Sequence, residues 1–140
     1  MHLNLFIHTR GHHEAAWRHS DASPLALSDI RYYADLAQRA EAGLFDSIFL
    51  ADQLSLRWDV KRAPRVWLEP FTALGALAMA TQRIGLIATA STTYSEPFNL
   101  TRQLASLHTL SAGRDRRNIA PSYSEDAPRP HGRYRQCGQP

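Results

Sequence analysis

The loop at residues 8–27 contains most of the side chains that could bind a metal ion or a ligand. Four of the chain's seven histidines lie in it, and His12 and His13 are adjacent. Histidine is the commonest metal ligand in proteins. However, adjacent histidines in a loop lack the His-x-x-x-His spacing that puts two rings on one helix face, and the only cysteine is the distant Cys137. The spacing therefore argues against a metal site.

One carboxylate and several short side chains follow two apolar runs that are typical of buried strands. Asp52 comes directly after the run at 48–51, and Thr89, Ala90 and Ser91 lie at the end of the run that begins at residue 84. A carboxylate in such a place either binds a ligand hydroxyl or N–H group or caps the next segment. Small residues let a flat ring approach the backbone, but they also pack well under a helix. The residues alone leave these alternatives open.

Alternating strands and helices are predicted to position these residues. The apolar runs are short and continuous, which is typical of strands covered on both faces. Helices between them are indicated by apolar residues at every third or fourth position, by Ser28 as a first cap and by Gly43 at the end of that helix. The predicted order is strand 3–7, helix 29–42, strand 48–51, helix 71–81, strand 84–90, a helix from residue 97 to about 110, and a fourth strand beginning at Asn118.

This alternation predicts an α/β fold with a parallel sheet and right-handed crossovers. Both an open doubly wound sheet and a (β/α)8 barrel fit the order of elements. A complete barrel needs about 250 residues, so 140 residues would form half a barrel or less. We expect a partial domain at residues 1–113, followed at 114–140 by a divergent, irregular basic tail that contains six arginines and four prolines.

Charge and hydropathy exclude several classes of protein. The net charge of +3 comes entirely from the tail, because residues 1–113 contain ten basic and ten acidic side chains. A tail without a recognisable module does not favour a nucleic-acid partner. No segment approaches the roughly 18 to 20 apolar residues that span a bilayer, and the first residues do not resemble a secretion signal. We therefore expect no membrane association and a cytoplasmic location.

Several segments resemble the luciferase-like flavin monooxygenases, in particular the nitrilotriacetate and dibenzothiophene-sulfone monooxygenase branch. They are GHHEAAWR at 11–18, AQRAEAGLFDSIFLADQL at 37–54, LEPFTALGALAMATQRIGLIATASTTYSEPFNLTRQLASLHTLSAGR at 68–114 and, more weakly, NIAPSYSEDA at 118–127. The spacing between FDSIFLAD and IGLIATASTTYSEPFNLTR is far more specific than a lone glycine motif.

The resemblance implies the N-terminal part of a (β/α)8 TIM barrel, with about three to four βα units, that binds reduced FMN at the carboxyl ends of its strands. Members receive this flavin from a separate NAD(P)H:flavin reductase and use it with O2 to oxygenate small organic substrates. The family often carries a non-prolyl cis peptide under the flavin, near Thr89. By resemblance, the cofactor contacts are Asp52, Thr89, Ala90, Ser91, Asn118 and Ser122, and the substrate-pocket residues are His12 and His13. No catalytic residue is assigned.

The chain departs from the family near its C-terminus. Members typically read GWNIVTS where this chain has RRNIAPS, so Arg117 replaces a tryptophan and Pro121 a threonine. An arginine in a core position needs a buried partner, and a proline removes a donor from a central strand. The phosphate site of such barrels is usually built by loops after the seventh and eighth strands. We therefore expect the chain to be too short for activity alone. The alternative is an inactive fragment or a non-enzymatic α/β module for binding or assembly. Full-length members often self-associate, so a homo-oligomer is a further expectation.

Overall fold

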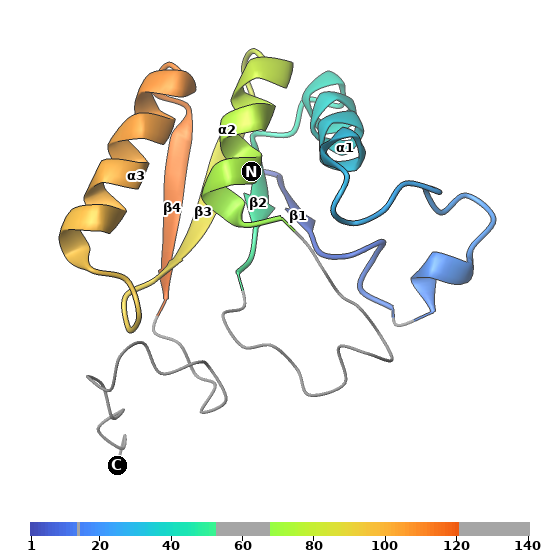
Figure 1. The fold of residues 1–140 in the computed structure, drawn as a ribbon. Coiled ribbons are helices and arrows are strands. Elements are labelled where there is room, and N and C mark those ends of the chain that lie inside the picture. The colour runs from blue at the N-terminus through green and yellow to red at the C-terminus, as the bar shows by residue number, and fades with distance from the viewer. Residues whose placement is uncertain (14, 53–67, 121–140) are drawn as a thin grey trace.

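The structure, a computed structural model, describes residues 1–13, 15–52 and 68–120. Its four strands form one sheet in the order β1-β2-β3-β4, and all neighbouring strands are parallel (Figure 1). The strands are β1 (Asn4–Ile7), β2 (Ser47–Leu50), β3 (Gly85–Ser91) and β4 (Asp115–Ala120). The predicted α/β fold with a parallel sheet is confirmed.

Three helices connect the strands and lie together on one face of the sheet (Figure 1). They are α1 (Ile30–Ala42), α2 (Pro70–Ala80) and α3 (Pro97–Leu110), and a 3-10 turn, η1 (Ala16–Arg18), lies in the loop before α1. The cap of α1 is Asp29, one residue after the predicted Ser28, because the Asp29 carboxylate accepts the backbone N–H of Arg31. None of the helices in the described ranges is long and apolar enough to cross a bilayer.

The two faces of the sheet differ because side chains alternate along each strand. On one face, Ile48, Leu86 and Ala88 have no exposed surface and pack against the helices in the main core. On the other face, Phe6, Phe49 and Ile87 are aligned across β1, β2 and β3 and are only partly buried. We call this second side of the sheet the open face, since none of the described helices covers it.

Strand β4 corrects two expectations about the C-terminal region. It begins at Asp115, three residues before the predicted start at Asn118, so the part predicted to be an irregular tail opens with a strand. Within the described residues β4 pairs only with β3, and Arg117 is exposed. The arginine therefore needs no buried partner. Pro121 and the rest of the predicted tail lie outside the described residues.

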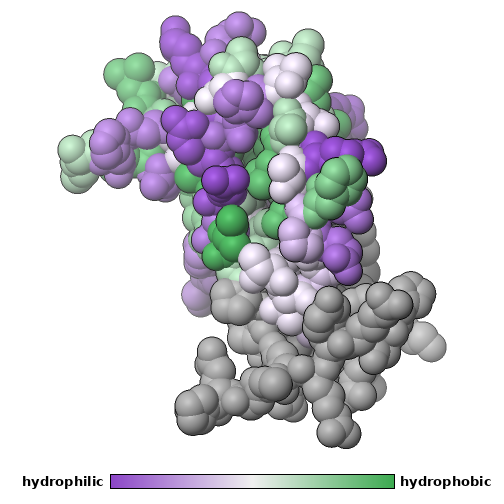
Figure 2. Space-filling view, turned by 90° about the vertical axis from the view of Figure 1, so that its left-hand side faces the viewer, coloured by the Kyte–Doolittle hydropathy of each residue, from purple (hydrophilic) through white to green (hydrophobic). Residues whose placement is uncertain are grey.

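The side of the molecule that carries α3 has a mixed surface. Its exposed apolar residues include Phe98 and Leu110 on α3 and Ile119 on β4. Figure 2 shows hydrophobic areas on this side interspersed with hydrophilic ones rather than joined into one patch. Scattered apolar residues of this kind are normal on protein surfaces.

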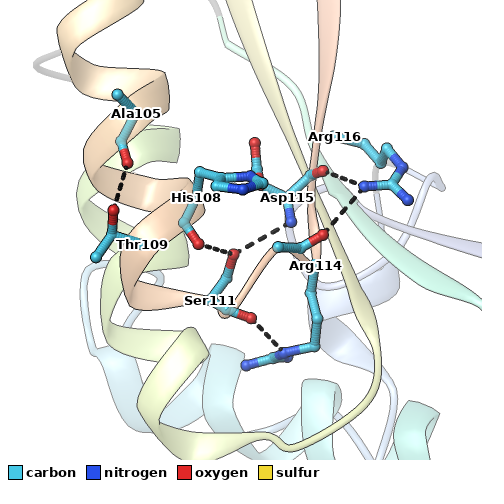
Figure 3. A network of polar contacts seen from close by, with 8 residues as sticks. Ala105, His108, Thr109, Ser111, Arg114, Asp115 and Arg116 are labelled. Carbon is cyan, nitrogen blue, oxygen red and sulfur yellow. Dashed lines mark hydrogen bonds and ion pairs between the residues drawn. The ribbon is translucent and has the colours of Figure 1, made fainter.

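The turn from α3 into β4 is held by its own polar groups (Figure 3). The Ser111 hydroxyl donates to the His108 carbonyl over 3.3 Å and accepts the Asp115 N–H over 3.2 Å. Arg114 donates from Nε to the Ser111 carbonyl over 2.9 Å. These bonds fix the point at which β4 enters the sheet.

Candidate functional site

A pocket of about 240 Å³ lies at the carboxyl ends of β1 and β2. It brings together two of the predicted site residues, His12 from the loop after β1 and Asp52 from the segment after β2. Carboxyl ends of strands are where parallel α/β folds place their functional residues. The pocket is lined by Phe6, Ile7, His8, Thr9, His12, Tyr33, Leu50, Ala51, Asp52 and Leu68.

Four rings form a cluster at this pocket, and three of them, Phe6, His8 and His12, line it. Phe6 and Phe49 pair in register, with ring centroids 4.9 Å apart. The Phe6 ring also lies 5.5 Å from the ring of His8 and 5.1 Å from that of His12, and the two histidine rings are 5.3 Å apart. The cluster gives the site flat, partly apolar walls.

Sequence reasoning missed Phe6, Tyr33 and Leu68 as lining residues, and it treated His8 only as a metal candidate. The signal for His8 was present in the sequence. Because side chains alternate along a strand, residues 6 and 8 must point to the same face when the strand continues into the loop. Tyr33 and Leu68 reach the pocket from elements distant in sequence, which no local pattern indicates.

The predicted residues on β3 and β4 form a separate group at the same end of the sheet. Thr89 pairs in register with Asn118, and the Asn118 amide donates to the Thr89 hydroxyl over 3.3 Å. Thr89 and Ser91 are each 8% exposed. Ala90 alternates to the helix side, where it packs with Leu100 and Leu104, so its side chain does not accompany its neighbours.

The register relates the two groups. Leu50 of β2 lies opposite Ala88 of β3. Asp52 comes two residues after Leu50 and Thr89 one residue after Ala88, so both lie toward the carboxyl end of the sheet. The residues that line the pocket do not include Thr89 or Asn118. The carboxyl edge of the sheet therefore has two parts: the pocket lies at the ends of β1 and β2, and the Thr89–Asn118 pair lies on β3 and β4.

Two predicted positions lie elsewhere or cannot be placed. His13 does not line the pocket; its Nδ1 accepts the backbone N–H of Ala15 over 3.1 Å and so stabilises its own turn. Ser122 lies outside the described residues. Across the described ranges, no three His, Cys, Asp or Glu side chains are grouped so as to hold a metal ion.

The backbone near Thr89 differs from one family expectation. All peptide bonds of the described residues are trans, including those that join Thr89, Ala90 and Ser91. The cis peptide expected there is not seen in this structure.

The sequence of this chain is similar to those of known monooxygenases of one family. Residues 3–138 match the model of the luciferase-like monooxygenases. The chain is 51% identical over 125 residues to N-acetyl-S-(2-succino)cysteine monooxygenase of Bacillus subtilis (strain 168), a match that covers 88% of this chain and 28% of that protein. It is 40% identical over 134 residues to nitrilotriacetate monooxygenase component A of Aminobacter aminovorans, covering 87% and 30% respectively. The chain thus spans less than a third of the length of these curated relatives.

The fold agrees with this match. A solved structure of riboflavin lyase with modified FMN and the substrate riboflavin is similar to the chain with a TM-score of 0.78 and 27% identity, over 90% of this chain and 31% of that one. The four parallel strands and their helices correspond to part of the TIM barrel of such enzymes. On this evidence, as the sequence resemblance predicted, the chain belongs to the luciferase-like monooxygenase family.

Proposed function

We propose that this chain forms the cofactor-binding edge of an FMN-dependent monooxygenase that acts in the cytoplasm. The enzyme receives reduced flavin from a separate NAD(P)H:flavin reductase and uses it with O2 to oxygenate a small organic molecule. The observation that carries the proposal is the pocket at the carboxyl ends of β1 and β2, where His12 and Asp52 meet in a member of this family.

The residues at this edge fit the ring of a flavin. Phe6, Phe49 and the two histidines of the cluster present flat surfaces, and Thr89 and Ser91 have short side chains toward the carboxyl end of β3. Asp52 supplies an acceptor for a ring N–H or a ribityl hydroxyl, and the amide of Asn118 supplies both a donor and an acceptor.

The size of the pocket limits what it holds. Sites for small molecules usually have volumes of roughly 300 to 1,000 Å³, and this pocket has about 240 Å³. No lysine or arginine is among its lining residues. The pocket therefore suits a ring system or a small substrate, and the described lining offers no cation for a phosphate group.

Bound FMN in its reduced form would supply the oxygen-activating chemistry, and the protein would supply binding, orientation and a dry environment. Asp52, which follows β2, and the Thr89–Asn118 pair of β3 and β4 would orient the cofactor, since all three lie toward the carboxyl ends of the strands. The rings of Phe6, Phe49 and His12 would shield one side of it from water. His12 also offers the substrate a polar ring in the pocket.

Two of the relatives support parts of this proposal. The riboflavin lyase structure holds a modified FMN. The nitrilotriacetate enzyme is designated component A, which implies a second component; for this chain we infer a flavin reductase in that role.

Flavin binding by the purified chain tests the proposal. FMN and riboflavin are titrated against the wild-type protein and Asp52→Asn while flavin fluorescence is followed. Loss of a charged hydrogen-bond acceptor is expected to weaken binding by about 10-fold or more. Asp35→Asn is the matched control, because Asp35 pairs with Arg39 on the surface of α1. If the wild-type chain binds neither flavin, the proposed function is wrong for this chain and a non-enzymatic binding or assembly module becomes the better interpretation.

A further inference from the structure

The turn that carries the pocket residues of the first loop has an unfavourable backbone conformation. Thr9 has φ of 52° and Gly11 has φ of 131°. The left-handed region suits glycine but is a genuine outlier for a β-branched residue such as threonine. At Gly11 a Cβ atom would lie only 3.0 Å from the Cβ of Ala16, so a side chain there would be strained in two ways. A turn of this kind persists only when its surroundings hold it.

Hydrogen bonds within the turn hold it in part. The Thr9 hydroxyl donates to the Gly11 carbonyl over 2.8 Å, and the Gly11 N–H donates to the His8 carbonyl over 3.2 Å. Arg10 reaches outward and donates from Nη2 to the Leu25 carbonyl over 2.6 Å. These bonds connect exposed or partly buried groups, so solvent competes for several of them.

One bond to the turn comes from the protein core. The Tyr32 hydroxyl donates to the Thr9 carbonyl over 2.7 Å. Tyr32 is 7% exposed and belongs to the main core, so α1 fixes its ring. Burial raises the pKa of Tyr32, and the hydroxyl therefore remains a donor at neutral pH. The strained residue is thus tied to the rigid part of the molecule.

The turn leads directly to the pocket. Thr9, in the turn, and His12, directly after it, both line the pocket. The His12 ring lies edge-on to the Phe6 ring, with an interplanar angle of 63°. We propose that Tyr32 is a positioning residue, which holds the Thr9 turn in its left-handed conformation and thereby places His12 against the pocket. The ligand-binding part of this inference rests on the proposed function, whereas the placement of His12 does not.

Tyr33→Phe is the control for the ring contacts only, because Tyr33 also lines the pocket. It is 5% exposed, and its hydroxyl donates to the Leu27 carbonyl over 2.8 Å, away from the turn. Tyr32→Phe and Tyr33→Phe each remove a buried tyrosine hydroxyl that donates to a backbone carbonyl, so both should lower the unfolding midpoint. Nuclear Overhauser contacts between the His12 and Phe6 ring protons should weaken in Tyr32→Phe and persist in Tyr33→Phe. Unchanged contacts in Tyr32→Phe, or equal losses in both variants, would overturn the proposal.

A rescue experiment tests whether backbone strain is the cause. Asparagine tolerates the left-handed region better than threonine does. Thr9→Asn in the Tyr32→Phe background should therefore restore the His12–Phe6 contact. A folded double variant that does not regain the contact would also overturn the proposal.

Riboflavin binding connects the placement of His12 to the site. The Kd for riboflavin should rise by about 3- to 10-fold in Tyr32→Phe, the effect of one neutral hydrogen bond, and fall again in the double variant. An unchanged Kd in Tyr32→Phe would contradict the role in binding. If the wild-type chain does not bind riboflavin, the proposed function fails, while the ring contacts still decide the role of Tyr32.

Discussion

At the amino ends of the strands charged side chains bind backbone groups, whereas at the carboxyl ends polar side chains border a pocket. Asp46, which precedes β2, accepts the N–H of Leu3 over 2.6 Å just before β1 begins. Glu41 accepts the N–H groups of Gln82, Arg83 and Ile84 before β3. The amino edge thus uses its charges to fix where strands enter the sheet.

Arg114 does the same for β4 and for the neighbouring helix ends. Besides Ser111, its guanidinium donates to the Ala78 and Ile84 carbonyls over 2.8 and 2.9 Å, and to both oxygens of Thr81. The end of α2, the start of β3 and the end of α3 are therefore joined through one side chain. At the carboxyl edge, by contrast, the bond from the buried Tyr32 hydroxyl holds Thr9, a strained residue that lines the pocket. Charged side chains therefore stabilise the sheet at its amino edge, and the binding function should be sought at the carboxyl edge.

The largest effect is expected from Arg114→Met. This substitution leaves several partly buried carbonyls without a donor, and the free energy of unfolding should fall by about 3 kcal/mol. Arg114→Lys should recover less than half of the loss, because one ammonium group cannot reach acceptors on three segments. Urea unfolding measures both variants, with Arg102→Met on the exposed side of α3 as the control. A loss of less than about 1 kcal/mol in Arg114→Met would contradict the stabilising role of the amino edge.

Glu41→Gln should have a smaller effect that depends on pH. At pH 7 the loss is expected to be about 1 to 2 kcal/mol, since a charged acceptor of three N–H groups becomes a neutral one. Burial by itself raises the pKa of Glu41, but the bonds from the N–H groups of Arg83, Ile84 and Gln82 outweigh it and lower the pKa below its ordinary value of 4.5.

The sign of this shift fixes the pH window. A lowered pKa in the folded state means that the stabilisation is complete above the ordinary pKa and is lost as the pH falls through the folded-state pKa. Urea unfolding at several pH values should therefore show a constant gap between wild type and Glu41→Gln above about pH 5, narrowing in more acidic solution. A gap that widens on acidification would contradict this account. Asp35→Asn on the surface of α1 should show little of either effect.

Local patterns explain what the sequence predicted correctly. Apolar runs and three-to-four-residue spacing are properties of single segments, so the sequence could predict the parallel sheet, its three helices and the positions of Asp52 and Thr89 toward the carboxyl ends of their strands. Asp52 and His12 met in one pocket because both follow neighbouring strands, which the order of elements already implied.

Contacts between distant segments explain what the sequence could not predict. In the sequence, Arg114 was only one of the basic residues of the predicted tail. In the structure, its side chain binds Ala78, Thr81 and Ile84, which lie 30 to 36 positions earlier in the chain. Nothing local indicated that Tyr32 would be buried or that its hydroxyl would reach Thr9, 23 positions away. Arg117 was expected to need a buried partner because its strand was assumed to be central; β4 has a neighbour on one side only within the described residues, so the side chain stays exposed.

Substitutions of the adjacent β4 residues Asn118 and Arg117 should affect stability least. They also separate a residue of the proposed binding site from one outside it. Asn118→Ala removes one long bond to Thr89 and should lower the free energy of unfolding by only about 0.5 kcal/mol, while raising the Kd for riboflavin by about 3-fold or more. Arg117→Ala should change neither quantity, because alternation directs this exposed side chain to the other face of the sheet. Urea unfolding and flavin titration of the two variants separate these outcomes. If Asn118→Ala instead lowers stability as much as Glu41→Gln does and leaves flavin binding intact, the Thr89–Asn118 pair is a structural bond like those of the amino edge, and the cofactor site must be confined to the pocket over β1 and β2.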